Sequence, residues 1–432
     1  MQVSAQVFSV ILSLAVTLAL SSRHAEALPY TWAWHWDPPL TGRELLLELE
    51  FKTNKQVRGI YAADPEGGSV RLLIPGGERA VWSPRRNYIS YLMGDELRMT
   101  RRDGKSDEYY DWAVRSDFEN PHEPSLVWAP NEAGFARVVH SLFGRDVIEL
   151  HEPLRPEEPL WTDEYTTSLS CITIYDPLGK APPEDPLFRP SYNSPTFSPD
   201  GKMACEIYPA KPLGRSESRI YVVEFRTLKE VPRDGSNPNL LLKKRLTDWP
   251  PGTIELQPLW SPTGEWIAFL GAELKPTDWA RIARQSFVDT YVCAWPGKEI
   301  FKLNFGLEVM IPRNGGRQWA GRDLQSEDRV GNLIAVEWSP DGKRLLLKQP
   351  DEAMYPIYVA QWNGKDWEAK YLRETRGRQC VFGPDSRWVA TVDGADRPTY
   401  SEDMVFITSV DSYPHTKEVK LPPGCRVLWM DW

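Results

Sequence analysis

Arginine and tryptophan side chains gather within residues 304–332, where their types suit recognition of a partner. They are Arg313, Arg317, Trp319 and Arg322. Both residue types are enriched among the few side chains that carry most of the binding energy in protein interfaces. We therefore interpret this stretch as a candidate site for a partner or ligand. The alternative is a solvated loop in which Trp319 packs against the rest of the protein.

An aromatic segment at residues 28–42 is the second candidate. Trp32, Trp34 and Trp36 alternate along it, so their rings share one side of the segment if the chain is extended. Two interpretations stay open. The rings plug or cap the folded domain, or they dock a partner protein or a carbohydrate.

Residues of the kinds that form catalytic or metal sites show no recognisable spacing. The six histidines form neither an HxH nor an HExxH pattern, and no phosphate-binding, dinucleotide-binding or EF-hand motif is present. Asp200 and Asp341 lie in turns of a repeat, where a structural role is expected. We therefore predict no catalytic residues, no metal site and no cofactor. Whether the protein is an enzyme stays uncertain, with a non-enzymatic role favoured.

The composition is typical of a folded all-β protein. Proline accounts for 38 of the 432 residues, above the usual share of about 5%, and this frequency disfavours long helices. The 19 tryptophans, 17 tyrosines and 14 phenylalanines allow a large aromatic core. The formal net charge of −9 offers no excess of positive charge for a phosphate backbone, so nucleic acid is not an expected partner.

The first 27 residues read as a secretory signal peptide. An apolar run covers residues 7–20 and Ala25-Glu26-Ala27 forms a cleavage site of the A-x-A kind, although no Lys or Arg precedes the run. We expect an exported protein, periplasmic or secreted. The run is shorter than a membrane span of ~20 residues, and no later segment is apolar enough to cross a bilayer, so no membrane span is expected after cleavage.

One short pattern recurs along the chain. An aromatic residue precedes Ser-Pro or a variant of it, then a turn and an apolar run, as in Trp-Ser-Pro-Asp-Gly-Lys at 338–343. These aromatic residues, the anchors, stand at 82, 128, 197, 260, 338, 382 and 429, so the copies are 46, 69, 63, 78, 44 and 47 residues apart. The shorter distances match one four-stranded unit of ~40–50 residues, and the longer ones add inserted loops.

Further strand-like runs follow most copies, so each copy predicts four strands joined by turns, the arrangement of a propeller blade. The pattern resembles the repeat of exported TolB-like β-propellers, a WD40-like repeat that also occurs in the propeller of prolyl oligopeptidase and dipeptidyl peptidase relatives. The resemblance covers residues 43–432 and implies a single all-β propeller domain. Two features differ from those relatives. Residues 28–40 are too few for the α/β domain that precedes the propeller of the family's translocation protein, and no Gly-x-Ser-x-Gly pentapeptide of a hydrolase domain occurs.

The two ends of the chain are predicted to close the ring. Residues 44–52, 58–63 and 69–74 read as three strands before the first anchor, whereas the strand at 426–431 has no strands after it. We expect the last strand to become the first strand of a blade whose other three strands are N-terminal. Six internal copies and this composite blade make seven four-stranded blades, and pairing the two ends hides their sheet edges.

Long insertions at 209–218, 271–287 and 304–332 enlarge one face of the predicted propeller, and a short helix is predicted at 277–284. Loops held by a rigid scaffold commonly carry binding. We expect a non-enzymatic module that binds another protein or a cell-envelope component. The alternative is a hydrolase or lyase acting on peptide or polysaccharide, with its site at the mouth of the propeller channel. Fold alone does not decide between these functions.

Overall fold

The computed structural model describes strands and turns along most of the chain from residue 36 onward. The described residues are 36, 38–52, 57–66, 68–94, 96–104, 107–112, 126–130, 132, 135–140, 146–151, 172–173, 190–209, 218–224, 242–249, 253–273, 289–297, 299–303, 310–313, 316–319, 334–348, 355–375, 379–394, 403–411 and 415–432. The predictions of a signal peptide at 1–27 and of a helix at 277–284 lie outside them. No helix among these residues is long and apolar enough to cross a membrane.

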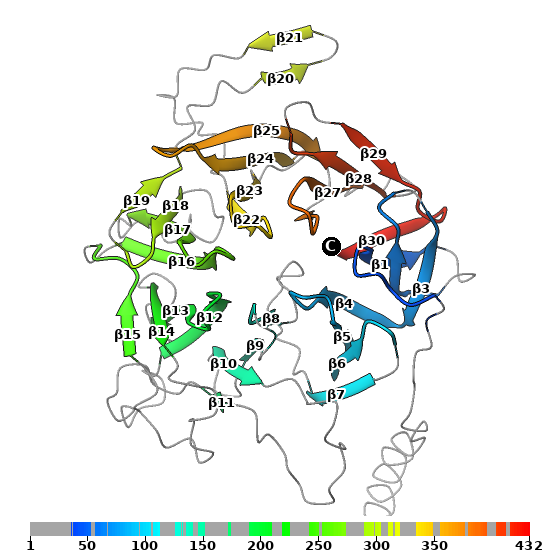
Figure 1. The fold of residues 1–432 in the computed structure, drawn as a ribbon, viewed down its shortest axis with the longest axis horizontal. Coiled ribbons are helices and arrows are strands. Elements are labelled where there is room, and N and C mark those ends of the chain that lie inside the picture. Colours follow the sequence, from blue (N-terminus) through cyan, green and yellow to red (C-terminus); the bar gives the residue numbers. More distant parts are fainter. Residues whose placement is uncertain are drawn as a thin grey trace, which may run out of the picture.

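Seven four-stranded antiparallel sheets occur among the described residues and stand in a ring around a central axis (Figure 1). In six of them the four strands follow one another along the chain. The first three are made of β4 (Gly77–Trp82), β5 (Tyr88–Met93), β6 (Glu96–Arg101) and β7 (Asp107–Trp112); β8 (Val127–Trp128), β9 (Phe135–His140), β10 (Asp146–His151) and β11 (Ile172–Thr173); and β12 (Pro190–Phe197), β13 (Met203–Pro209), β14 (Arg219–Glu224) and β15 (Leu242–Arg245).

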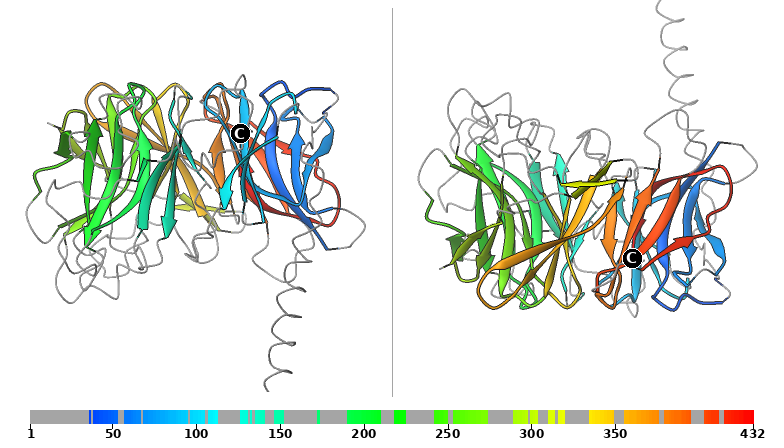
Figure 2. Two further views of the ribbon diagram at one scale, coloured as in Figure 1. Left: turned by 90° about the horizontal axis from the view of Figure 1, so that it is seen from below. Right: turned by 90° about the horizontal axis from the view of Figure 1, so that it is seen from above.

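The fourth to sixth sheets continue the ring. They are made of β16 (Thr253–Trp260), β17 (Trp266–Glu273), β18 (Asp289–Ala294) and β19 (Ile300–Lys302); β22 (Ile334–Trp338), β23 (Arg344–Lys348), β24 (Tyr355–Trp362) and β25 (Trp367–Thr375); and β26 (Cys380–Phe382), β27 (Trp388–Asp393), β28 (Met404–Ser409) and β29 (Thr416–Val419). Seen edge-on, the sheets stand side by side and their strands run between the two faces of a disc (Figure 2).

The remaining sheet is composite and joins the two ends of the chain. Its order is β3 (Val70–Pro75), β2 (Gly59–Ala63), β1 (Leu45–Phe51) and β30 (Cys425–Asp431). Strand β30 runs antiparallel to β1, with Leu46 opposite Asp431 and Phe51 opposite Cys425. The predicted closure of the ring by the C-terminal strand is therefore confirmed. Because β30 covers one edge of β1, the closure also hides an edge that would invite pairing with other chains.

The stretch at 304–332, interpreted above as a loop, contains an additional hairpin. Strands β20 (Met310–Arg313) and β21 (Gly316–Trp319) form a two-stranded sheet of their own. In Figure 1 the hairpin lies outside the ring of sheets. Short strands flanking a tight connection are enough to form such a pair, although no alternating pattern marked them in the sequence.

Buried apolar side chains lie mainly between neighbouring sheets, which therefore hold one another in the ring. Leu47 of the composite sheet, Ile407 of the sixth sheet and Trp432 belong to one cluster. Val222 of the third sheet and Phe269 of the fourth belong to another. Removing these side chains from water supplies the main favourable contribution to folding. Most of the predicted anchors are among the buried residues, namely Trp82, Trp128, Trp260, Trp338, Phe382 and Trp429.

The inner strand of each sheet, nearest the axis, is β30 in the composite sheet and the first strand along the chain in the six others (Figure 1), and several of these inner strands carry a bulge. The pairing register shifts within β4, β12 and β16, where Arg79, Ser194 and Gln257 have φ values of 49°, 49° and 47°. A bulge re-aims backbone groups locally. Here the Arg79 N–H donates to Glu48 of the preceding sheet at 3.0 Å, and the Gln257 N–H donates to Glu206 at 3.3 Å.

Candidate functional site

A repeated hydrogen bond links each of three inner strands to the sheet that follows it. The residue just before the anchor accepts the backbone N–H of the next anchor. Thr196 Oγ1 accepts from Trp260 N at 3.0 Å, Glu337 Oε2 from Phe382 N at 2.8 Å, and Asp431 Oδ2 from Trp82 N at 2.7 Å. A hydroxyl and two carboxylates thus serve the same purpose, because each satisfies a backbone donor that would otherwise be enclosed between two sheets.

The strand pairings of the fifth and composite sheets show that the last anchor is not at the predicted position. Glu337 lies opposite Leu346, and the anchor Trp338 lies opposite Leu345. Asp431 lies opposite Leu46 in the composite sheet, so the place of the anchor belongs to the next residue, Trp432. The predicted anchor, Trp429, is three residues too early. The sequence could not distinguish them, since Val-Leu-Trp at 427–429 resembles the opening of a copy and Met-Asp, not Ser-Pro, follows Trp429.

Three indole groups fasten the closing strand to the N-terminal sheets. Trp429 Nε1 donates to the carbonyl of Ala80 at 2.9 Å, and Trp432 Nε1 donates to the carbonyl of Arg43 at 2.8 Å. From the other side of the seam, Trp82 Nε1 donates to the carbonyl of Glu44 at 3.2 Å. The closure is therefore held by side chains on both sides of the β30–β4 boundary as well as by the β1–β30 ladder.

Two carboxyl groups and one guanidinium gather at this boundary, and we call Arg86, Glu337 and Asp431 the axial trio. They come from the first, fifth and composite sheets. The sixth sheet separates the fifth from the composite sheet (Figure 1), and the charges of Asp431 and Arg86 nevertheless act on Glu337. Arg86 Nη1 donates to the carbonyl of Gly42 at 3.2 Å, and its guanidinium lies 5.6 Å from the centre of the Trp82 ring. All three side chains keep a partly exposed surface.

The trio is electrostatically unbalanced when all its groups are charged. Burial raises the pKa of Glu337 to about 8; the nearby Asp431 charge adds to this effect, and the Phe382 N–H and Arg86 oppose it. Burial also raises the pKa of Asp431, although the hydrogen bond from the Trp82 N–H and the charge of Arg86 act to lower it. Burial lowers the pKa of Arg86, although the negative charges of Asp431, Glu337 and Glu44 act to raise it. Two carboxyl groups facing one guanidinium favour uptake of one proton.

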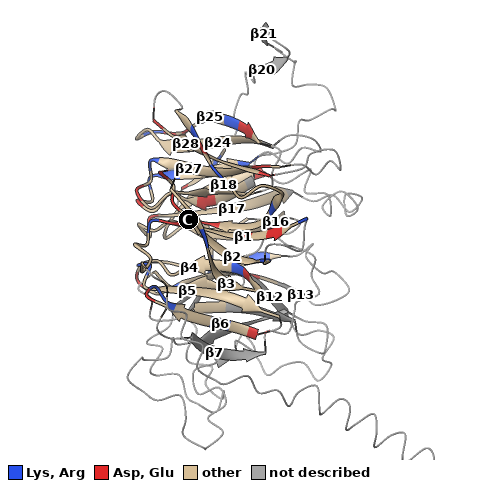
Figure 3. Cartoon of the chain, turned by 90° about the vertical axis from the view of Figure 1, so that its right-hand side faces the viewer, with Lys and Arg blue, Asp and Glu red and all other residues tan. Residues whose placement is uncertain are grey.

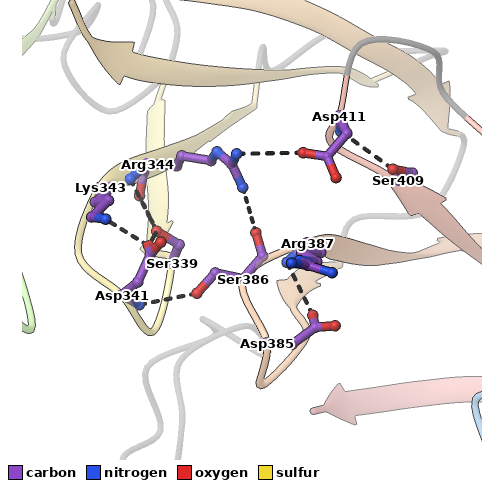
Figure 4. Close-up of polar contacts among 9 residues, drawn as sticks. All are labelled: Ser339, Asp341, Lys343, Arg344, Asp385, Ser386, Arg387, Ser409 and Asp411. Carbon is purple, nitrogen blue, oxygen red and sulfur yellow. Dashed lines mark hydrogen bonds and ion pairs between the residues drawn. The ribbon is translucent and has the colours of Figure 1, made fainter.

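A second candidate surface is formed by turns of the fifth and sixth sheets, shown in Figure 4. The turn between β22 and β23 contacts the turn between β26 and β27: the Asp341 N–H donates to Ser386 Oγ at 3.0 Å, and Arg344 Nη1 donates to the Ser386 carbonyl at 2.7 Å. Arg344 also lies 3.5 Å from Asp411, before β29. We call this the turn surface; its other members are Ser339, Lys343, Asp385, Arg387 and Ser409.

Each turn of this surface is also ordered internally. Ser339 Oγ donates to Asp341 Oδ1 at 2.6 Å and accepts the Arg344 N–H at 2.9 Å. Partial burial of Asp341 is outweighed by hydrogen bonds from Ser339 and the Lys343 N–H and by two nearby cations, so the pKa of Asp341 is lowered. The turn role predicted for Asp341 is consistent with these contacts. Gly342 has φ of 68°, and a Cβ there would lie 2.6 Å from Thr263, so the position requires glycine.

Charges of both signs therefore stand on the turn surface in fixed positions. Asp341, Lys343, Asp385, Arg387 and Asp411 are exposed. Figure 3 shows basic and acidic residues interspersed at turns along one side of the disc, while most of the strand ribbons carry neither. Exposed charged pairs add little stability. The charges of the turn surface are therefore considered as possible contacts for a partner.

The residues predicted as binding sites from the sequence do not come together in one described site. Trp36 is buried with the composite and first sheets, and its Nε1 donates to the Leu73 carbonyl at 3.3 Å. Trp32, Trp34 and Arg322 lie outside the described residues. The backbones of Arg313, Arg317 and Trp319 lie on the β20–β21 hairpin, opposite Gly316, Pro312 and Met310 respectively.

Metal-binding geometry is absent from the described part of the chain, where no three His, Cys, Asp or Glu side chains gather closely enough to hold an ion. The axial trio was not anticipated from the sequence. One signal for it existed, an acidic residue directly before a tryptophan in Glu337-Trp338 and again in Asp431-Trp432. Thr196 shows why that signal is ambiguous, because a neutral hydroxyl fills the same position.

Comparison with solved structures places this architecture among known folds. The β-propeller domain of the trilobed protease from Pyrococcus furiosus is 14% identical and matches over 89% of this chain and 96% of that chain, with a TM-score of 0.51. The fold is a β-propeller. Other similar structures are TolB from Acinetobacter baumannii (15% identical, 82% of this chain, TM-score 0.39) and oligogalacturonate lyase from Vibrio parahaemolyticus (11% identical, 86% of this chain and 84% of that chain, TM-score 0.47).

The likeness to TolB covers 65% of the Acinetobacter baumannii chain, slightly less than two thirds of its length. The likeness to the propeller of the trilobed protease agrees with the β-propeller fold predicted from the repeat. At these identities the comparisons concern the propeller fold alone. No protein-family model and no curated protein matches the chain.

Proposed function

We propose that this propeller is an exported, non-enzymatic module that binds another protein or a component of the cell envelope. The observation that carries the proposal is the turn surface. Its turns are fastened to one another through Ser386 and Arg344, so the exposed charges are held in position before any partner arrives. Preorganised groups lose less conformational freedom on binding, and a mixed array of charges selects partners by electrostatic complementarity.

Export rests on the apolar run at 7–20 and the Ala-Glu-Ala stretch that follows it. Trp32, Trp34, Arg313, Arg317, Trp319 and Arg322 are proposed as further contacts, on the residue types alone. The opposite face of the propeller, on which the sequence predicts the long insertions, would then carry a second contact region. The proposal does not require both regions to bind the same partner.

One observation favours the alternative, a hydrolase or lyase acting on peptide or polysaccharide. Glu337 is partly exposed near the axis and its pKa is raised to about 8, as expected of a general acid that works near neutral pH. Its Oε2 already accepts the Phe382 N–H, in the position that Thr196 fills elsewhere. A hydroxyl in that position has no acid function, so we favour the structural role for Glu337.

The two functions are separated by one set of experiments on the mature protein, residues 28–432. Tagged protein is used to capture partners from an envelope extract of the source organism, with identification by mass spectrometry and confirmation with the purified partner. Charge reversal of Lys343 and Arg387 to Glu is expected to reduce capture at least tenfold, and reversal of Arg313, Arg317 and Arg322 tests the second region. Lys370→Glu on the outer strand β25, which is exposed, is the matched control and should bind normally.

Unchanged capture by both charge-reversed proteins would remove the proposed surfaces. A parallel screen on peptide and polysaccharide substrates tests the alternative. Turnover that Glu337→Gln abolishes, while the variant keeps its fold, would replace the binding proposal by an enzymatic one.

A further inference from the structure

Five arginines stand where the first and composite sheets meet, and we call Arg43, Arg85, Arg86, Arg101 and Arg102 the arginine patch. Arg85 and Arg86 lie in the turn between β4 and β5, Arg101 ends β6 and Arg102 follows it, and Arg43 precedes β1. Arg86 is partly exposed and the other four are exposed. The arginine patch and the turn surface lie on the same face of the disc, because each contains a turn that follows the inner strand of a sheet.

Backbone and side-chain contacts bring the three segments of the arginine patch together at Gly42. The Arg102 N–H donates to the Asn87 carbonyl at 2.8 Å, which joins the turn after β6 to the turn between β4 and β5. Arg86 Nη1 donates to the Gly42 carbonyl at 3.2 Å. A Cβ on Gly42 would lie 3.3 Å from Arg86 Cβ and 3.6 Å from Arg102 Nη1. Both side chains therefore lie beside one residue, and the other members of the patch are sequence neighbours of these residues.

Nearby carboxylates bind donors other than the guanidinium groups. Glu132 Oε1 accepts the Arg85 N–H at 2.8 Å, and its Oε2 accepts Asn87 Nδ2 at 2.9 Å. Glu44 accepts the backbone N–H groups of residues 41, 42 and 43 at 2.8, 2.9 and 3.0 Å. Within the described ranges, no carboxylate forms an ion pair with a guanidinium of the patch. Elsewhere such pairs hold Arg58, Arg98, Arg245, Arg344 and Arg373.

The acidic neighbours of the patch are also less exposed than its arginines. Glu44, Asp103, Glu132 and Asp431 are all partly exposed, whereas four of the five arginines are exposed. A partner that approaches this part of the face therefore meets guanidinium groups first. A guanidinium donates two parallel hydrogen bonds to a carboxylate, and arginine is one of the residues that carry most of the energy in protein interfaces.

We propose that the arginine patch binds an acidic segment of a partner protein, whose Asp or Glu carboxylates accept hydrogen bonds from the guanidinium groups. This inference rests on the proposed function and names the chemistry of one partner. The net charge of −9 favours a short segment over a membrane surface. An extended array of phosphates would also face the exposed acidic residues of the turn surface, which repel it. A short segment meets only the local positive charge.

Fluorescence anisotropy of a labelled peptide of ten glutamates tests the patch in the purified protein, with a peptide of ten glutamines as the uncharged probe. At low salt the wild type should bind the glutamate peptide at least about tenfold more tightly than the glutamine peptide. Raising the salt to about 0.5 M should weaken the binding, because salt screens exposed charges. Equal binding of the two peptides by the wild type overturns the proposal.

Variants assign the binding to the patch. Arg85→Glu combined with Arg102→Glu should weaken binding of the glutamate peptide at least about tenfold. Arg426→Glu, at an exposed arginine that begins β30 at the opposite face, is the matched control and should bind like the wild type. Thermal unfolding verifies that each variant is folded. Wild-type affinity in the folded Arg85/Arg102 variant overturns the proposal.

The turn-surface variant, with Lys343→Glu and Arg387→Glu, carries the same change of charge on the same face. It should keep its affinity for the glutamate peptide, and an equal loss in both double variants would show a general effect of charge and overturn the patch. Tighter binding of phosphatidylglycerol vesicles than of the peptide, lost in the Arg85/Arg102 variant, would assign the patch to lipid instead. The peptide test uses no envelope extract, so a failure of partner capture counts against the proposed function and a failure of peptide binding against the patch.

Discussion

Replacing Trp432 by alanine is expected to lower the free energy of unfolding by about 3–5 kcal/mol, the usual cost of truncating a core tryptophan. The side chain is 7% exposed and belongs to the cluster between the composite and sixth sheets. Its ring also fills the space beside Gly383, where a Cβ would come within 2.9 Å of it. Alanine would remove these contacts and leave a cavity at the boundary that closes the ring.

A second substitution separates packing from hydrogen bonding. Trp432→Phe keeps an aromatic ring but loses the donor to the Arg43 carbonyl, which is 2.8 Å away. That bond contributes about 0.5–1.5 kcal/mol, so the Phe variant should lose clearly less stability than the Ala variant. Urea unfolding followed by far-UV circular dichroism measures both. Val57→Ala, at a side chain that is 52% exposed, is the control, expected within about 0.5 kcal/mol of the wild type.

A free energy of unfolding for Trp432→Ala within about 1 kcal/mol of the wild type would show that Trp432 is not the last anchor. An equal loss in the free energy of unfolding in the Phe and Ala variants would show the same, because the stabilisation would then not come from the packed ring.

Three further substitutions test contacts elsewhere in the ring. Thr196→Val should cost about 1–3 kcal/mol by leaving the Trp260 N–H without its acceptor; urea midpoints check this, and Thr196→Ser should restore stability. Gly383→Ala should cost about 1–3 kcal/mol because the new methyl group meets Trp432, and a midpoint equal to that of the wild type would show that the packing is looser than described. The pKa of Asp341 is lowered in the fold, so its carboxylate stabilises the protein above the ordinary pKa of 3.8 and this contribution is lost as pH falls below it. Asp341→Asn should therefore be less stable at pH 7 by under about 1 kcal/mol, given its exposure, and the difference in thermal unfolding should disappear at low pH; a difference independent of pH would count against the carboxylate.

The strands of the propeller could be predicted from local patterns. Apolar runs between turn residues placed the N-terminal strands β1, β2 and β3 to within a few residues, because a strand buried between sheets needs a continuous apolar run and a turn needs proline or glycine. Closure by the last strand was also predictable, since three strands at one end of the chain and a single strand at the other complete one four-stranded sheet.

The axial trio could not be predicted in the same way. Arg86, Glu337 and Asp431 are far apart in the sequence, and each occupies a position that other copies fill with a neutral or apolar residue. The bulges at Arg79 and Gln257 were equally hidden, because their positive φ values depend on the acceptors Glu48 and Glu206 in the preceding sheet. Such features arise from contacts between sheets, and no local pattern encodes them.

Removal of residues 424–432 tests most directly the claim that the C-terminal strand closes the ring. Without β30, the sheet of β1, β2 and β3 loses its inner strand and the first and sixth sheets lose their shared neighbour. The thermal midpoint of the truncated protein is expected to fall by at least about 5 °C, and a synthetic peptide of residues 424–432 is expected to raise it again, with a shift that grows with the logarithm of the peptide concentration once binding is saturated. A truncated protein that melts like the full chain, with no response to the peptide, would contradict the account.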